Sequence, residues 1–163
     1  MAKKDVPGLA CRLAGPDDAE ALAAMIADFA AYERMASQAT AETLRNELSR
    51  PDRVLEAVLA TLDGKPVGMA AFFQSFSTFI ARRGIYLEDI YVKEECRNKG
   101  IATAMLKHIA QIARERDIGR VEFTVLLWNN VAIEFFETLG ATPNSAWTTY
   151  RLSGDWLKKL AGE

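Results

Sequence analysis

Residues 86–103 read YLEDIYVKEECRNKGIAT, and this stretch decides which fold the chain adopts. Its first seven residues are apolar or aromatic apart from two carboxylates, which is typical of a strand within a sheet. Alternate residues of a strand share a face, which predicts one face with Ile85, Leu87, Asp89 and Tyr91 and another with Tyr86, Glu88, Ile90 and Val92. A loop around Gly100 follows, and apolar residues at helical spacing then predict a helix to about Arg116.

Extended and helical patterns also occur on both sides of this stretch. The elements expected upstream are a strand at 11–14, helices at about 17–32 and 41–50, and strands at 54–61 and 67–73, the last two joined by an Asp63-Gly64 hairpin turn. The elements expected downstream are a strand at 121–127, a helix at 131–139 ended by Gly140, a strand at 148–152 and a short terminal helix.

This order of elements predicts an α/β fold. The central strand-helix-strand crossover requires a parallel pair of strands, whereas the hairpin requires an antiparallel pair. We therefore expect a mixed sheet with helices on both faces. No repeat, low-complexity stretch or linker interrupts residues 1–163, so one domain is expected. Because this architecture serves many functions, the site has to decide which one applies.

Composition excludes several classes of protein. No apolar run approaches the ~18–20 residues that span a bilayer, so no membrane association is expected. The 20 basic and 22 acidic residues are interspersed, unlike the basic stripe of a nucleic-acid binder. Cys11 and Cys96 are too far apart for a metal knuckle, and no metal site is expected. The first residues lack a secretory pattern, which predicts a cytoplasmic protein with reduced thiols.

The loop Arg97-Asn98-Lys99-Gly100-Ile101-Ala102 has the features of an anion site. A loop that enters a helix presents unpaired N–H groups and the positive end of the helix dipole. Gly100 and Ala102 keep the surface small enough for a pyrophosphate to approach the backbone, and Arg97 and Lys99 are expected to add charged contacts. The alternative is an ordinary strand-to-helix turn that contains a glycine.

Two further features have a chemical meaning. Glu88 and Asp89 lie within an apolar strand, where carboxylates are costly unless they are solvated, paired or useful. They either cap loop amides, or Glu88 is a base whose pKa is raised by partial burial. Further along, Asn129 or Asn130 is expected to cap the next helix and to meet a ligand lying between two strands that splay apart.

Residues 86–140 resemble the signature region of the GNAT acyltransferase superfamily. The resemblance rests on the Arg-x-x-Gly-x-Ala loop, its flanking strand and helix, the Trp128-Asn129 pair and the Phe-rich helix after it. Residues 86–89 (Tyr-Leu-Glu-Asp) and 31–33 (Ala-Tyr-Glu) are similar to the diamine (spermidine/spermine) and thialysine N-acetyltransferases. The resemblance extends over nearly the whole chain.

The resemblance implies a centrally splayed GNAT-like sheet and acetyl-CoA as cosubstrate. The donor's pyrophosphate is then expected on Asn98, Lys99, Gly100, Ile101, Ala102 and Thr103, next to Arg97. Its remaining contacts are expected from Ile90, Tyr91, Val92, Asn129 and Phe136. Glu88 is implied as a water-linked base, and Tyr32, Glu33 and Asp89 are implied near the amine. Members of this family are homodimers.

Two residues depart from the family pattern. Phe136 replaces a tyrosine that acts as general acid on the departing thiolate, and it has no hydroxyl group. Residues 77–79 (Ser-Thr-Phe) replace an acidic position of the polyamine enzymes and are closer to the thialysine branch.

Three functions follow from this pattern. The first is transfer of an acetyl group from acetyl-CoA to a primary amine of a small aliphatic substrate, by direct attack in a ternary complex. The substrate would be a thialysine-like amino acid or a di- or polyamine. The second is a CoA-binding protein with weak or lost catalysis that serves as a sensor or interaction module. The third, weaker one is acylation of protein lysines or N-termini.

Overall fold

The computed structural model describes residues 6–163, which divide into two compact units at the boundary between Thr124 and Val125. The elements of the first unit are β1 (Leu9–Leu13), η1 (Pro16–Asp18), α1 (Ala19–Tyr32), α2 (Ala41–Ser49), β2 (Glu56–Leu62), β3 (Lys65–Ser77), β4 (Arg82–Val92), η2 (Glu94–Cys96), α3 (Ile101–Glu115) and β5 (Val121–Phe123). Those of the second are α4 (Asn130–Thr138) and α5 (Asp155–Ala161). Among the described residues, no helix combines the length and the apolar character needed to cross a membrane.

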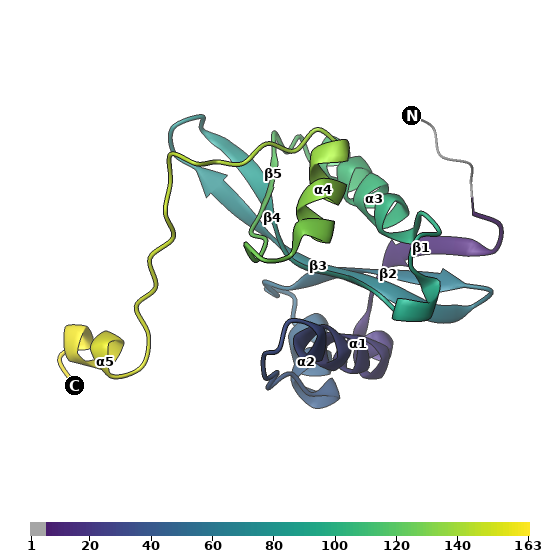
Figure 1. Cartoon of the computed structure of the whole chain (residues 1–163). Helices are drawn as coiled ribbons and strands as arrows, with labels where there is room; N and C mark the ends of the chain where they lie inside the picture. Colours follow the sequence, from purple (N-terminus) through teal and green to yellow (C-terminus); the bar gives the residue numbers. More distant parts are fainter. Residues whose placement is uncertain (1–5) are drawn as a thin grey trace. The chain divides into compact units, whose positions relative to one another are not determined.

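The sheet of the first unit is mixed, as the sequence predicted. Its strands lie in the order β1-β2-β3-β4-β5 (Figure 1), with antiparallel pairing from β1 to β4 and a parallel β4–β5 pair. The β2–β3 turn has positive φ at Asp63 (48°) and Gly64 (78°). These are the values of a two-residue type I′ hairpin, whose twist matches that of the strands.

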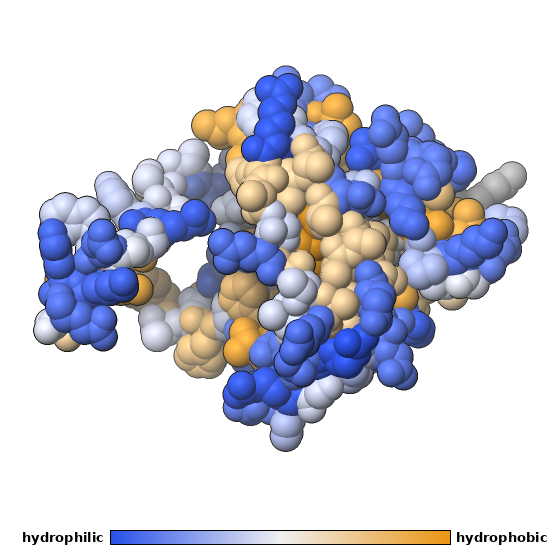
Figure 2. All heavy atoms as spheres, turned by 90° about the horizontal axis from the view of Figure 1, so that it is seen from below, coloured by the Kyte–Doolittle hydropathy of each residue, from blue (hydrophilic) through white to orange (hydrophobic). Residues whose placement is uncertain are grey.

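Helices cover both faces of this sheet, which also confirms the prediction. On one face, Leu22 and Met25 of α1 and Leu44 of α2 pack against sheet residues that include Leu59 and Met69. On the other face lies α3 (Figure 1): a Cβ built at Gly68 would be 3.1 Å from the Met105 side chain and 3.4 Å from that of Ile101. Half of the residues of α1 are alanines. Seen from below, the surface of the molecule shows a band of apolar residues between hydrophilic ones (Figure 2).

A bulge in β4 corrects the predicted assignment of residues to faces. Ala71 of β3 pairs with Asp89 and Phe72 pairs with Leu87, so Glu88 is an extra residue without a partner in β3. Residues on the two sides of the bulge therefore exchange faces. Ile85, Leu87, Ile90 and Val92 point toward α3, whereas Tyr86, Asp89 and Tyr91 point toward α1 and α2.

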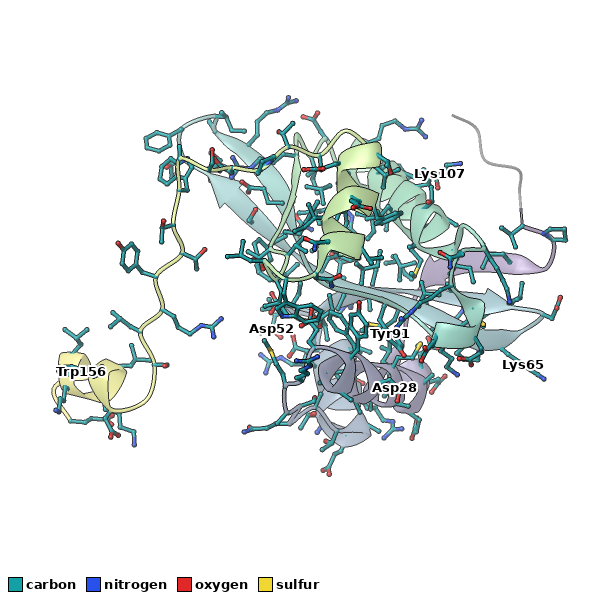
Figure 3. The ribbon with its side chains drawn as sticks, viewed as in Figure 1. Asp28, Asp52, Lys65, Tyr91, Lys107 and Trp156 are labelled. Atoms are coloured by element: carbon teal, nitrogen blue, oxygen red, sulfur yellow. The ribbon has the colours of Figure 1, made fainter. Side chains whose placement is uncertain are left out.

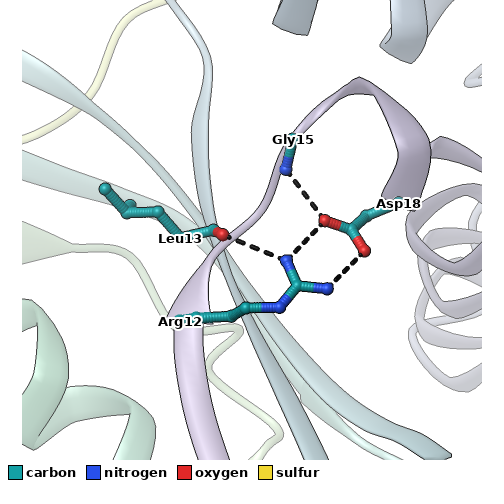
Figure 4. A network of polar contacts seen from close by, with 4 residues as sticks. All are labelled: Arg12, Leu13, Gly15 and Asp18. Atoms are coloured by element: carbon teal, nitrogen blue, oxygen red, sulfur yellow. Dashed lines mark hydrogen bonds and ion pairs between the residues drawn. The ribbon is translucent and has the colours of Figure 1, made fainter.

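Side chains fix the ends of several elements. Arg12 donates two hydrogen bonds to the Asp18 carboxylate, at 2.7 and 2.8 Å, and the Gly15 N–H donates a third at 2.8 Å (Figure 4). These contacts hold the turn between β1 and α1, with Asp18 at the positive end of the α1 dipole. At α2, Thr40 is the N-cap and accepts from the Thr43 N–H at 3.1 Å.

The structure is more regular than expected in some segments and less regular in others. β3 extends beyond both predicted ends and β4 begins three residues earlier than predicted, while β5 has three residues instead of the seven of the predicted strand at 121–127. The strand predicted at 148–152 is wrong, since these residues have no regular secondary structure. A strand requires a neighbour for its backbone groups, and a short alternating pattern does not supply one. The terminal helix is present as α5.

Candidate functional site

The loop before α3 has the geometry of an anion-binding loop. Asn98 (φ 62°) and Gly100 (φ 82°) both adopt left-handed conformations, which turn the chain sharply into the helix. α3 has no side-chain cap, and within residues 6–163 the N–H groups of 98–103 have no hydrogen-bond acceptor. Free N–H groups at the positive end of a 15-residue helix form a site for a phosphate group.

A cavity of about 540 Å³ borders this loop. Its lining residues come from the loop, α3 and the N-terminal segment around β1: Val6, Leu9, Cys11, Asn98, Lys99, Gly100, Thr103, Ala104, Lys107, His108 and Gln111. None of these is acidic, whereas Lys99, Lys107 and His108 are basic. The cavity therefore suits a ligand with several negative charges.

Lys107 and His108 were missed by the sequence analysis, although a signal for them exists. Gly100, Thr103 or Ala104, Lys107 or His108, and Gln111 recur at intervals of three to four residues, so they lie on one face of α3. That face carries the polar residues of an amphipathic helix, which are usually assigned to solvent. Only the proximity of β1 turns this face into the wall of a cavity. In Figure 3, Lys107 and Tyr91 are labelled on opposite sides of the sheet.

In the structure, the Arg97 side chain contacts the end of β4 and two aromatic rings, and its predicted contact with the donor stays a prediction. Its Nε donates to the Val92 carbonyl oxygen at 3.1 Å, and its guanidinium carbon lies 4.8 Å from the Tyr32 ring centroid and 5.8 Å from that of Tyr91. The cavity lining does not include Arg97. Lys99 does line the cavity, and its ammonium donates to the Glu95 carbonyl oxygen at 3.0 Å.

On the α1 side of the sheet, carboxylates gather around Asp89. Burial and the charges of Glu88 and Glu33 raise the pKa of Asp89 from 3.8 to about 6. Glu33 lies at the C-cap of α1, the negative end of the helix dipole, and burial raises its pKa as well. Tyr32 directly precedes Glu33 in the chain. The three residues predicted to lie near the amine, Tyr32, Glu33 and Asp89, are therefore near one another.

Glu88 differs from its expected environment, because its side chain is exposed. The expected partial burial of Glu88 is wrong for a physical reason: the bulge leaves it outside both packed faces. The carboxylate of this strand that is partly buried is Asp89. Among the described residues, no group of three or more His, Cys, Asp or Glu side chains is arranged to hold a metal ion.

The edge of β4 beyond β5 provides an open backbone. Parallel pairing runs from Ile85–Val121 to Leu87–Phe123, after which β5 ends while β4 continues to Val92. Ile90, Tyr91 and Val92, from which further contacts with the donor are expected, therefore lie past the last β5 pair, and only Lys93 and η2 separate them from the loop before α3.

Two predicted donor contacts lie in the second unit. Asn129 is the N-cap of α4, and its side chain accepts from the Ala132 N–H at 3.2 Å, as expected. Phe136 is the buried residue of α4, with its ring 5.2 Å from that of Phe135. Their contacts with the donor stay predictions.

Comparison with known proteins identifies the family of the chain. Residues 22–141 match the Acetyltransferase (GNAT) family. The chain is 33% identical to a thialysine N-ε-acetyltransferase of Caenorhabditis elegans, with 91% of this chain and 94% of the relative covered. It is 36% identical to an L-ornithine N5-acetyltransferase of Arabidopsis thaliana over 68% of this chain and 45% of that protein. A crystal structure of a probable acetyltransferase has a TM-score of 0.78 and 26% identity, over 90% of this chain and 98% of that one.

The open-edged mixed sheet and the anion-binding loop define the fold of an acyltransferase. The chain belongs to the GNAT family, and it is an N-acetyltransferase. The likeness to thialysine and spermidine/spermine N-acetyltransferases that its motifs predicted is confirmed.

The environment of Asp89 predicts a pH-dependent cost in stability. Because the folded state holds the Asp89 proton more tightly than the unfolded state, stability falls as the pH rises from about 3.8 to about 6, and the loss persists above that. Asp89→Asn removes this cost. We expect the variant to be more stable than the wild type at pH 8 by about 1–2 kcal/mol, reduced from the full shift by residual solvent screening. Urea unfolding at pH 4 and pH 8 measures the difference, which should nearly vanish at pH 4.

Proposed function

We propose that this enzyme transfers the acetyl group of acetyl-CoA to a primary amine of a small aliphatic substrate in a ternary complex. One observation carries the proposal: the end of β4 connects an anion-binding loop with a cluster of carboxylates. A polyanionic donor and a cationic amine then meet along one short strand, each next to charges of opposite sign.

The residues of the first unit fit the donor. Coenzyme A carries a diphosphate and a 3′-phosphate, and the free N–H groups of 98–103 together with the basic cavity offer partners for both. We assign the diphosphate to the N–H groups of Asn98, Lys99, Gly100, Ile101, Ala102 and Thr103. The 3′-phosphate is assigned to Lys107 and His108. The donor supplies a thioester carbonyl that an amine can attack.

The carboxylates have two tasks in this proposal. Tyr32, Glu33 and Asp89 bind the amine as a cation, and a carboxylate then accepts the proton that the amine has to lose. Glu88, through water, or Asp89 takes this proton. The amine nitrogen forms a bond to the acetyl carbon, and the carbon–sulfur bond breaks. The nitrogen loses its second proton as the amide forms, and since Phe136 has no hydroxyl, water relays that proton to the departing thiolate.

The relatives narrow the substrate class. Thialysine and ornithine, named in two of them, are amino acids with a primary amine at the end of an aliphatic chain. We therefore propose a thialysine-like amino acid, with di- and polyamines as the second group. The alternative function, a CoA-binding protein with weak catalysis, is favoured by Phe136 alone.

The direct test measures thiol release from acetyl-CoA with a panel of thialysine, ornithine, lysine, putrescine and spermidine. We expect turnover with at least one amine, and an increase in melting temperature with acetyl-CoA. A hundredfold excess over the dissociation constant corresponds to about 2.7 kcal/mol of stabilisation. Gly100→Val should abolish both effects, because φ 82° suits glycine. A melting-temperature shift without turnover would select the CoA-binding alternative, and the absence of both would reject the proposal.

Two isosteric variants distinguish the candidate bases. A base is needed most while the amine is protonated, so replacing it should reduce kcat by about 10²–10⁴-fold at pH 7 and by less at pH 10. We expect this pattern for either Glu88→Gln or Asp89→Asn. The other variant should raise KM for the amine more than it lowers kcat. A loss that is equal at all pH values in both variants would make both residues structural.

We also propose that the enzyme acts as a cytoplasmic homodimer. Large apolar side chains are exposed in both units, among them Phe79 (89%) at the β3–β4 turn and Tyr150 (91%) in the second unit. Large apolar side chains exposed to this degree are often covered in contacts between proteins. Sedimentation equilibrium should give twice the 18.0 kDa of the chain, and a single-chain mass at micromolar concentration would contradict the dimer.

A further inference from the structure

We propose that Arg97 is a positioning residue that makes the binding of the two substrates cooperative. It belongs to the donor loop by sequence, yet its guanidinium is held by aromatic rings on the amine side. This inference rests on the proposed function, because it requires a donor at the loop and an amine near Asp89.

The contacts of Arg97 join three elements. Its backbone directly precedes the N–H groups assigned to the donor. Its Nε donates to the Val92 carbonyl at the end of β4, 3.1 Å away. Its guanidinium lies within cation–π distance of Tyr32 on α1 and of Tyr91 on β4, at 4.8 and 5.8 Å. A residue with these three contacts fixes the loop and the end of α1 relative to the same strand.

The end of α1 is where the amine side is defined. Tyr32 is its last residue, Glu33 is its C-cap, and Arg34 then reverses the chain with φ 59°. The charge of Glu33 acts on Asp89 across the gap between α1 and β4. The contact of Arg97 with the Tyr32 ring therefore restrains the distance between the Glu33 and Asp89 carboxylates, which are proposed to bind the cation.

Cooperativity follows from this shared restraint. A ligand shifts a conformational equilibrium only if it binds one state better. The donor binds the state of the loop in which the N–H groups are aligned. The same loop conformation places the Arg97 guanidinium beside the rings of Tyr32 and Tyr91. The amine binds the state in which Tyr32 and Glu33 are fixed. Each ligand thus favours the state that the other prefers, and the effect has to be reciprocal.

Isothermal titration calorimetry with CoA and thialysine, or whichever amine of the panel binds, tests the proposal. For the wild type we expect the dissociation constant of the amine to fall at least about fivefold when CoA is saturating, with an equal factor for CoA when the amine is saturating. In Arg97→Gln the factor should approach one, while each ligand alone still binds. In kinetics, KM for the amine should rise more than kcat falls.

Matched variants separate this role from a change of charge or of fold. Arg34→Gln removes the same charge from the same end of α1, and it should retain the cooperative factor. Tyr32→Phe keeps the ring and should retain it, whereas Tyr32→Leu should lose it. If Arg97→Gln does not fold, the two Tyr32 variants provide the test alone.

Three outcomes would overturn the inference. They are a factor of one in the wild type, a factor that survives both Arg97→Gln and Tyr32→Leu, or an Arg97→Gln variant that loses CoA affinity with an unchanged factor. The last outcome would make Arg97 a simple donor ligand. Failure of the wild type to bind CoA or any amine would instead reject the proposed function, so the two failures are distinguishable.

Discussion

The bulge at Glu88 is the constraint on which the site depends. A regular strand would place Asp89 on the same face as Ile85 and Leu87, the face that packs against α3. A carboxylate there would be buried in an apolar core without a partner, at a cost of several kcal/mol. The extra residue at Glu88 lets β4 give Ile85, Leu87, Ile90 and Val92 to the α3 core while Asp89 and Tyr91 face α1. A single strand thus contributes apolar side chains to the cores on both faces of the sheet and also carries the carboxylate of Asp89.

The same position is where β4 leaves its parallel neighbour. Pairing with β5 ends at Leu87, one residue before the bulge, and bulges bend and twist the strand that contains them. The three residues that approach the anion-binding loop are consequently past the end of β5. The bulge that exposes Glu88 and buries Asp89 therefore coincides with the opening of the sheet edge.

The sequence predicted the fold well because its signals are local. The period of α1 and α3, the Asp63-Gly64 turn and the Gly100 loop each depend on a few neighbouring residues, and all are present. The errors concern features that depend on a partner. A bulge is defined by the register with β3, and a strand at 148–152 requires another strand beside it. Pattern alone specifies neither of these.

The candidate site divides in the same way. The loop could be predicted, because its glycine and its position before a helix are visible in the sequence. Lys107 and His108 could not be separated from an ordinary solvent face, since β1 forms the other wall of their cavity. The contact of Arg97 with Tyr32 joins residues far apart in the chain, and a charged residue in a phosphate-binding motif is naturally assigned to phosphate.

The environment of Asp89 also makes the proposed amine site unstable while no cation is bound there. Three carboxylates repel one another, and burial raises the cost, so in the free protein the pKa of Asp89 rises to about 6. A bound ammonium group would offset the repulsion between the carboxylates and stabilise their charged form. The pKa of Asp89 would then fall again. Once the amine has given up its proton, the compensation disappears and the carboxylate again becomes a better proton acceptor. A group whose basicity increases as its ligand loses charge suits a reaction in which a cation has to become a neutral nucleophile.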